Sequence, residues 1–148
     1  MSYTALKYHV VFSTKDRRRL ILPAMLPRLV EYVGGIARQR KASLLAANGP
    51  EDHLHLLVAM PADLAVSEFL REVKCVSSSW IHENFPHWHG LGWQDGYAAF
   101  TVSQSGVERV QEYIQNQQKH HKTLSFEEEL KTMLTRHGIA FDERYVLG

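Results

Sequence analysis

The stretch Glu51-Asp52-His53-Leu54-His55-Leu56-Leu57-Val58 puts two histidines one residue apart at the head of an apolar run. The run ends at Met60 and is bounded by Gly49-Pro50 and Pro61. A short run rich in Leu and Val between turn signals predicts a buried strand. Strand side chains alternate between the two faces, so both imidazoles leave the same face about 7 Å apart. Such a pair can hold a divalent metal, or it can be an ordinary half-exposed pair of histidines.

Hydrophobic periodicity along the rest of the chain predicts an α+β fold. Strands are expected over residues 5–14, 41–48, 53–60 and 97–103, and helices over about 23–40 and 67–85. The order strand-helix-strand-strand-helix-strand is that of the ferredoxin-like (split β-α-β) fold, an antiparallel sheet with both helices on one face. His53 and His55 are then expected on the opposite face of the sheet. The length fits a single domain over 1–148, with the ferredoxin-like core at about 5–103.

Two C-terminal helices are expected after this core, at about 105–122 and 125–137. Ser105 and Glu108 have the spacing of a capping box at the start of the first helix. Ser125 and Glu128 have the same spacing at the start of the second, which Gly138 would end.

The first C-terminal helix carries two polar side chains on its apolar face. Tyr113 and Gln117 lie one turn apart on the face that Val107, Val110 and Ile114 define. An amide in a core needs partners, and a metal ion would give one to its oxygen. The alternative is an ordinary core aromatic beside a boundary glutamine.

These residues together resemble the single-tyrosine HUH transposases of the insertion sequence 200/605 kind, which include the REP-associated tyrosine transposases. The resemblance covers nearly the whole chain in the right order. It rests on the motifs His53-Leu54-His55, Tyr113-Ile114-Gln115-Asn116-Gln117 with His120-His121, Tyr8-His9-Val10-Val11-Phe12-Ser13-Thr14-Lys15, Trp93-Gln94-Asp95-Gly96-Tyr97-Ala98-Ala99-Phe100, and Phe141-Asp142-Glu143-Arg144-Tyr145.

The resemblance implies an enzyme that cleaves and rejoins DNA strands. His53, His55 and Gln117 would bind Mg²⁺ or Mn²⁺, and Tyr113 would attack the phosphodiester to form a 5′-phosphotyrosine intermediate and release a 3′ hydroxyl. A divalent ion suits this reaction because it neutralises the phosphate and stabilises the leaving oxyanion. Imidazole suits zinc, copper or nickel better than magnesium, so the identity of the ion stays open.

The resemblance also implies partners. Single-stranded DNA is the expected substrate, at the hairpin ends of a mobile element, and a homodimer is the expected assembly. Tyr113 could act in its own subunit or in the partner's. A related subfamily acts on repeated extragenic palindromes, so a domesticated nuclease is an alternative to a transposon-borne enzyme.

The charge distribution is consistent with a nucleic-acid partner. The net charge is only +1, yet residues 1–41 carry nine Lys/Arg against two Asp/Glu, while residues 42–148 carry eight against fourteen. A basic loop with four cations in five residues suits phosphate contacts, although it could simply be a solvated loop. The candidate DNA contacts are Lys15, Arg17, Arg18, Arg19, Lys74 and His120.

Two other histidine clusters could compete for the metal. His87-Trp88-His89 has the same spacing as His53 and His55 but lies in a loop-like stretch. We interpret it as part of the surface or as a contact for single-stranded DNA. His120 and His121 are consecutive, so on a helix they diverge and cannot easily bind one ion. We expect both to face the solvent, with His120 able to approach a phosphate.

The amino-acid composition narrows the classes of protein to which the chain could belong. The single cysteine, Cys75, excludes an internal disulfide and fits a reducing cytosol. No segment approaches the roughly 18 apolar residues of a membrane span, and no signal peptide is expected. Two readings from other classes stay open: a ferredoxin-like nucleic-acid-binding module without catalysis, and a metal-bound structural or regulatory protein.

Overall fold

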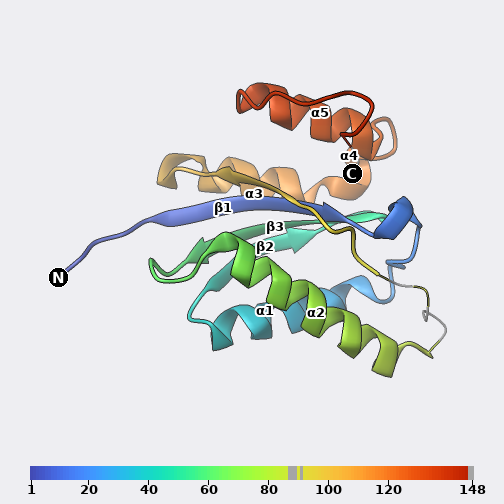
Figure 1. The fold of residues 1–148 in the computed structure, drawn as a ribbon, viewed down its shortest axis with the longest axis horizontal. Helices are drawn as coiled ribbons and strands as arrows, with labels where there is room; N and C mark the ends of the chain where they lie inside the picture. The colour runs from blue at the N-terminus through green and yellow to red at the C-terminus, as the bar shows by residue number, and fades with distance from the viewer. Residues whose placement is uncertain (87–89, 91, 147–148) are drawn as a thin grey trace.

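The computed structural model describes residues 1–86, 90 and 92–146. Its centre is a four-stranded antiparallel sheet in the order β2-β3-β1-β4. The strands are β1 (Leu6–Ser13), β2 (Ser43–Asn48), β3 (His53–Met60) and β4 (Ala98–Thr101). Helices α1 (Leu26–Gln39) and α2 (Val66–Asn84) cover one face, while α3 (Val107–Gln115), α4 (Gln117–His120) and α5 (Phe126–Arg136) lie on the other side (Figure 1). The predicted ferredoxin-like fold is confirmed.

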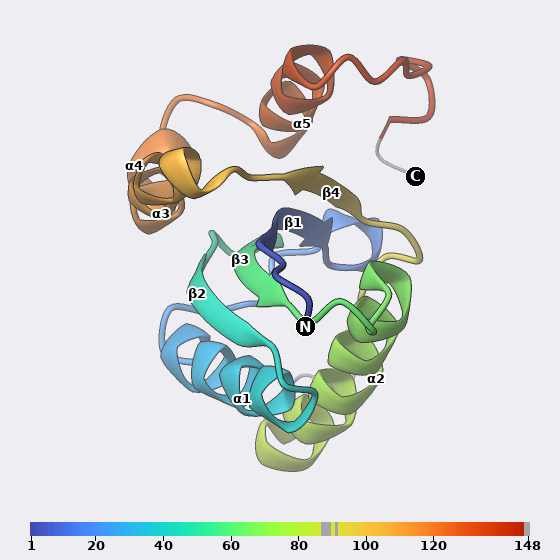
Figure 2. The same cartoon turned by 90° about the vertical axis from the view of Figure 1, so that its left-hand side faces the viewer.

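Strand β3 separates two kinds of side chain between these faces. Leu54, Leu56 and Val58 are buried in the main apolar core beneath α1 and α2. His53 and His55 point the other way, and neither side chain is exposed to solvent. Figure 2 shows the sheet between the α1–α2 layer and the helices of the C-terminal part. The alternation predicted from the sequence therefore puts both imidazoles on the face that the last helices cover.

The first two helices lie close to their predicted ranges, and each buries one face. Helix α1 begins after a turn at residues 23–25, three residues later than expected, and its stripe Met25, Leu29, Val33 and Ile36 is buried. On α2 the buried face includes Ser77, whose hydroxyl accepts a hydrogen bond from the Trp93 indole at 3.1 Å.

The first C-terminal helix differs from its prediction in two ways. The capping box of Ser105 and Glu108 is wrong, because residues 104–106 form a 3-10 turn and the Ser105 hydroxyl contacts Ser103 instead. The single helix over 105–122 is also wrong, because it breaks at Asn116 into α3 and α4. At the break, the carbonyls of Ile114 and Gln115 accept from the Asn48 side chain. Those carbonyls would otherwise accept from the next helical turn.

The last helix begins and ends as predicted. The Ser125 hydroxyl accepts from the Glu128 amide at 3.2 Å and caps α5. Gly138 follows the helix with a φ of +69°, a left-handed conformation that favours glycine. Among the described residues, no helix combines the length and apolar character needed to cross a membrane.

The turn that leads into β3 depends on a close backbone approach. A Cβ atom on Gly49 would lie 2.1 Å from the carbonyl oxygen of His53, which cannot rotate away. We expect Gly49→Ala to lower the free energy of unfolding by about 1–3 kcal/mol, because the turn must shift to admit the methyl group. Denaturation in urea measures this change.

Gly96→Ala is the matched control, since a Cβ there meets no atom within 4 Å. It should stay within about 0.5 kcal/mol of the unsubstituted protein. Equal stability of the two variants would contradict the tight turn before His53.

Candidate active site

The imidazoles of β3 meet a carboxylate from the last helix. Nε2 of His53 and Nε2 of His55 each lie 3.0 Å from Oε1 of Glu129 on α5. His121, directly after α4, brings a third Nε2 to the same oxygen, also at 3.0 Å. One ligand atom from each of these four residues lies within 4.8 Å of the others, so they form a candidate metal-binding cluster. The four residues come from β3, from the residue that follows α4, and from α5.

Tyr113 and Gln117 complete the cluster from α3 and α4. The Tyr113 hydroxyl donates to Oε2 of Glu129, and Nε2 of Gln117 donates to the same oxygen at 3.0 Å. Gln117 is fully buried. Its Oε1 atom has no hydrogen-bond partner among the described residues. A buried carbonyl oxygen without a partner costs about 1–3 kcal/mol, so this atom points to a missing electropositive group.

The opposite nitrogens of the two β3 imidazoles are also engaged. Nδ1 of His53 donates to Asp52 Oδ1 at 2.7 Å, and Nδ1 of His55 lies 2.8 Å from Nε2 of His9 on β1. The Phe126 ring stacks on His53 with centroids 4.3 Å apart. These contacts fix both ring planes and leave the Nε2 atoms directed into the cluster, as the outer contacts of metal-binding histidines do.

Burial and neighbouring charge set the protonation of the cluster. Burial lowers the pKa of His9 to about 3 and that of His55 to about 4, so both imidazoles are neutral at pH 7. Burial also acts on His53, but hydrogen bonds to Asp52 and Glu129 outweigh it and raise its pKa. Burial opposes ionisation of Glu129, yet its three imidazole partners hold the pKa of the carboxyl far below its usual range.

Tyr113 is held as a phenol in this arrangement. Burial raises the pKa of its hydroxyl, and the adjacent Glu129 carboxylate raises it further. His120 stacks on the Tyr113 ring with centroids 4.8 Å apart and planes at 25°. The ring is therefore fixed between the helices, with its hydroxyl directed at the carboxylate.

The structure brings together four of the residues predicted to form the site: His53, His55, Tyr113 and Gln117. All four belong to one chain. His120 contacts the tyrosine ring rather than the carboxylate, so the two consecutive histidines have different partners. The alternative cluster His87-Trp88-His89 lies outside the described residues.

The predicted basic contacts come from several segments of the chain. Lys15 and Arg17 are exposed on the loop after β1, which is tied to the turn before β3 by Thr14 N–H donating to Asp52 at 2.9 Å. The Lys74 ammonium on α2 donates to the carbonyls of Gln94 and Gly96, and residues 94–96 also line a pocket with Lys15 and Arg17. Arg18 approaches Gly90, and Arg19 lines the pocket described next.

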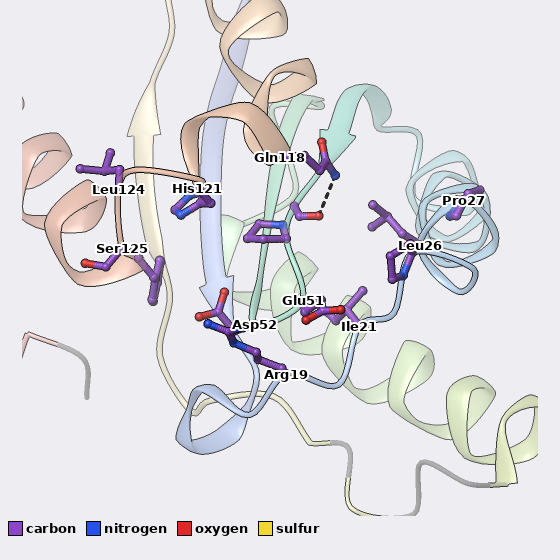
Figure 3. Close-up of a pocket in the computed structure, with 14 residues that line it drawn as sticks. Arg19, Ile21, Leu26, Pro27, Glu51, Asp52, Gln118, His121, Leu124 and Ser125 are labelled. Atoms are coloured by element: carbon purple, nitrogen blue, oxygen red, sulfur yellow. Dashed lines mark hydrogen bonds between the residues drawn. The ribbon is translucent and has the colours of Figure 1, made fainter.

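Two pockets flank the cluster. The first has a volume of about 470 Å³ and lies between the start of α1 and the connection from α4 to α5 (Figure 3). Arg19, Asp52 and His121 line it, and Gln118 closes one wall by donating to Gly49 at 3.1 Å. The second pocket is lined by Tyr113 together with His9, Arg109, Glu129, Arg136 and His137.

Four residues of the site were missed or misread in the sequence. His121 was expected to face the solvent and is instead part of the cluster, so that expectation is wrong. The signal was its position four residues after Gln117, on the same helical face. Glu129 was missed although it interrupts the apolar stripe Phe126, Leu130 and Met133 of α5. His9 and Asp52 contact the Nδ1 atoms of the two β3 histidines. No spacing along the sequence indicates such contacts.

The donor set fits a divalent ion. Three imidazole nitrogens converge on one carboxylate oxygen, and Gln117, whose amide nitrogen contacts the same carboxylate, keeps its buried amide oxygen without a partner among the described residues. Imidazole, carboxylate and amide oxygens are all ligands of divalent metals in proteins. His53, His55 and Gln117 would hold such an ion.

Comparisons with known proteins identify the family of the chain. The family described as "Transposase IS200 like" has a sequence model that matches residues 2–117. The chain is 31% identical over 120 residues to the transposase for insertion sequence element IS200 of Salmonella typhimurium, covering 75% of this chain and 76% of that one. It is 26% identical over 117 residues to the ISDra2 transposase TnpA of Deinococcus radiodurans, covering 76% and 84%.

Solved structures show the same fold. A crystal structure assigned as a transposase from Deinococcus radiodurans superposes with a TM-score of 0.64 at 28% identity, covering 78% of this chain and 93% of that one. A REP-associated tyrosine transposase bound to a REP hairpin superposes with a TM-score of 0.60 at 17% identity, covering 82% and 72%. With the family match over most of its length, the chain belongs to the IS200-like transposases, which are enzymes of DNA transposition and recombination.

Proposed function

We propose that this transposase cleaves and rejoins single-stranded DNA at hairpin-containing ends, with Tyr113 as nucleophile and a divalent ion held by His53, His55 and Gln117. One observation carries the proposal. The Tyr113 hydroxyl and both β3 imidazoles contact the same Glu129 carboxylate, so they lie within reach of one phosphodiester. The expectation of a hairpin substrate comes from the family resemblance. The expectation that the ion is Mg²⁺ or Mn²⁺ comes from the same resemblance.

Tyr113 supplies the attacking oxygen. Its bond to phosphorus forms as the bond from phosphorus to the 3′ oxygen breaks, which leaves a 5′-phosphotyrosine and a 3′ oxygen that takes up a proton from water to become a free 3′ hydroxyl. The phenol must lose its proton, and Oε2 of Glu129 is already in contact to accept it. Rejoining follows when another 3′ hydroxyl attacks the phosphotyrosine, since that bond keeps the energy of the original diester.

The ion, when bound, neutralises the phosphate and stabilises the leaving 3′ oxygen. The protein's task is to keep its ligands neutral and oriented. Burial keeps His55 uncharged at neutral pH, which leaves a ring nitrogen lone pair for coordination. Asp52 and His9 accept from the Nδ1 atoms of the two ligand histidines when the Nε2 atoms coordinate.

Cationic side chains flank this centre on both sides. Arg19 lines the first pocket, while Arg109 and Arg136 line the second pocket together with Tyr113. A strand crossing the cluster would place phosphates near these guanidinium groups. The exposed Lys15, Arg17 and Arg18 extend the basic surface, and they remain predicted DNA contacts, as do Lys74 and His120. The homodimer also stays a prediction, and Tyr113 could act in its own subunit or in the partner's.

A covalent-adduct assay tests the proposal directly. The protein is incubated with Mn²⁺ and a labelled single-stranded hairpin, and the adduct is resolved on a denaturing gel. We expect Tyr113→Phe to abolish the adduct because it removes only the attacking oxygen. Hairpin binding should persist, since the ring and its stacking on His120 are kept.

Ligand variants provide the control in the same assay. His53→Ala and Gln117→Ala should reduce cleavage by more than they reduce hairpin binding. An adduct that survives in Tyr113→Phe would refute the nucleophile. Binding without any adduct in the unsubstituted protein would favour a nucleic-acid-binding module instead.

The neutral imidazoles also predict a pH dependence of stability in the ion-free protein. Folding lowers the pKa of His9 to about 3 and of His55 to about 4, so below about pH 6.5 the unfolded chain binds more protons than the folded one. Stability present above pH 6.5 is therefore lost as the pH falls, by about 1.4 kcal/mol per pH unit and group. Urea denaturation in chelator between pH 7 and 5 measures the slope.

His9→Gln removes one of the two groups and should give a shallower slope than the unsubstituted protein. Identical slopes would mean that His9 is not a buried neutral imidazole.

A further inference from the structure

The cluster contains two potential ligands beyond those that the family resemblance implies. We infer that His121 and Glu129 are ligands of the ion, so that this chain holds it with three imidazoles, a carboxylate and the Gln117 amide oxygen. The inference rests on the proposed function, because it takes His53 and His55 as ligands of the same ion.

The spacing of four donor atoms, from His53, His55, His121 and Glu129, supports their binding of one ion. Nε2 of His53, His55 and His121 each lie 3.0 Å from Oε1 of Glu129. Neighbouring ligands of a six-coordinate ion with bonds of about 2.1 Å lie about 3.0 Å apart. The four donor atoms lie within 4.8 Å of one another, so a small movement of side chains would admit the ion.

Charge supports the same assignment. Glu129 is 1% exposed, and its two oxygens contact three imidazoles, an amide and a phenol. A buried carboxylate is stable only with a compensating cation or strong donors. A divalent ion beside Oε1 provides that charge while leaving the imidazoles neutral. The Nδ1 atoms of His53 and His55 are taken by Asp52 and His9, so their Nε2 atoms are the ones free to coordinate.

The ligand set determines which ions the site prefers. Magnesium is bound mainly by oxygen, whereas Mn²⁺, Co²⁺ and Zn²⁺ accept imidazole readily, and affinity rises from manganese to cobalt. Three imidazoles therefore favour a transition metal over Mg²⁺. Because the ligands come from β3, the end of α4, and α5, the ion would also cross-link the last helix to the sheet.

Cobalt binding tests the inference without reference to catalysis. The full chain is stripped with chelator and titrated with Co²⁺ and with Mg²⁺ by calorimetry, and the visible absorption of Co²⁺ is recorded because it reports the ligands. We expect tighter binding of Co²⁺ than of Mg²⁺. His121→Ala and Glu129→Gln should each weaken Co²⁺ binding about 10–100-fold and change its spectrum.

Glu127→Gln is the matched control, because Glu127 lies on the same helix and pairs with Lys131 at the surface. It should bind and absorb like the unsubstituted protein. Circular dichroism establishes that each stripped variant is folded; if Glu129→Gln is not, the spectrum of His121→Ala decides.

His53→Ala separates the two proposals. If it loses Co²⁺ binding while His121→Ala and Glu129→Gln match the unsubstituted protein, the further ligands are refuted and the proposed function stands. Tighter Co²⁺ binding by Glu129→Gln would also refute them, because the carboxylate would then compete with the ion. Unchanged binding in all three variants would overturn the ion site of the proposed function itself.

Discussion

The alternation of side chains along β3 is the constraint on which the site depends. Its leucines at 54 and 56 enter the core beneath α1 and α2, and its histidines at 53 and 55 face α5. A shift of one residue in register would bury imidazoles among aliphatic side chains and expose leucines to the polar cluster. The packing of the apolar core therefore fixes the position and direction of both imidazoles.

The second face of the sheet is built around a carboxylate instead of an apolar centre. Glu129 joins β3, α3, α4 and α5 through its five polar contacts, and smaller apolar contacts of Phe126, Leu130 and Met133 surround it. Nearly all polar atoms in this network are paired, which is the usual condition for burying them. The amide oxygen of Gln117 is the exception, and it points to chemistry beyond folding.

Much of this arrangement could be predicted from the sequence because it depends on local periodicity. The strand at residues 53–60 matched its predicted bounds, the fold followed from the order of elements, and the motif resemblance indicated the family. The break at Asn116 could not be predicted, since it depends on the Asn48 side chain of a distant strand. Glu129 was missed for a similar reason, because the role of a carboxylate on an apolar stripe can be inferred only when its partners are known.

One ion is expected among the β3 imidazoles, with the Tyr113 hydroxyl beside it. Anomalous diffraction from crystals grown with Mn²⁺ tests this most directly, because the metal is located by its own scattering. We expect one strong peak about 2.1 Å from Nε2 of His53 and of His55, in contact with Oε1 of Gln117. A peak elsewhere on the protein, with none between these imidazoles at saturating Mn²⁺, would contradict this expectation.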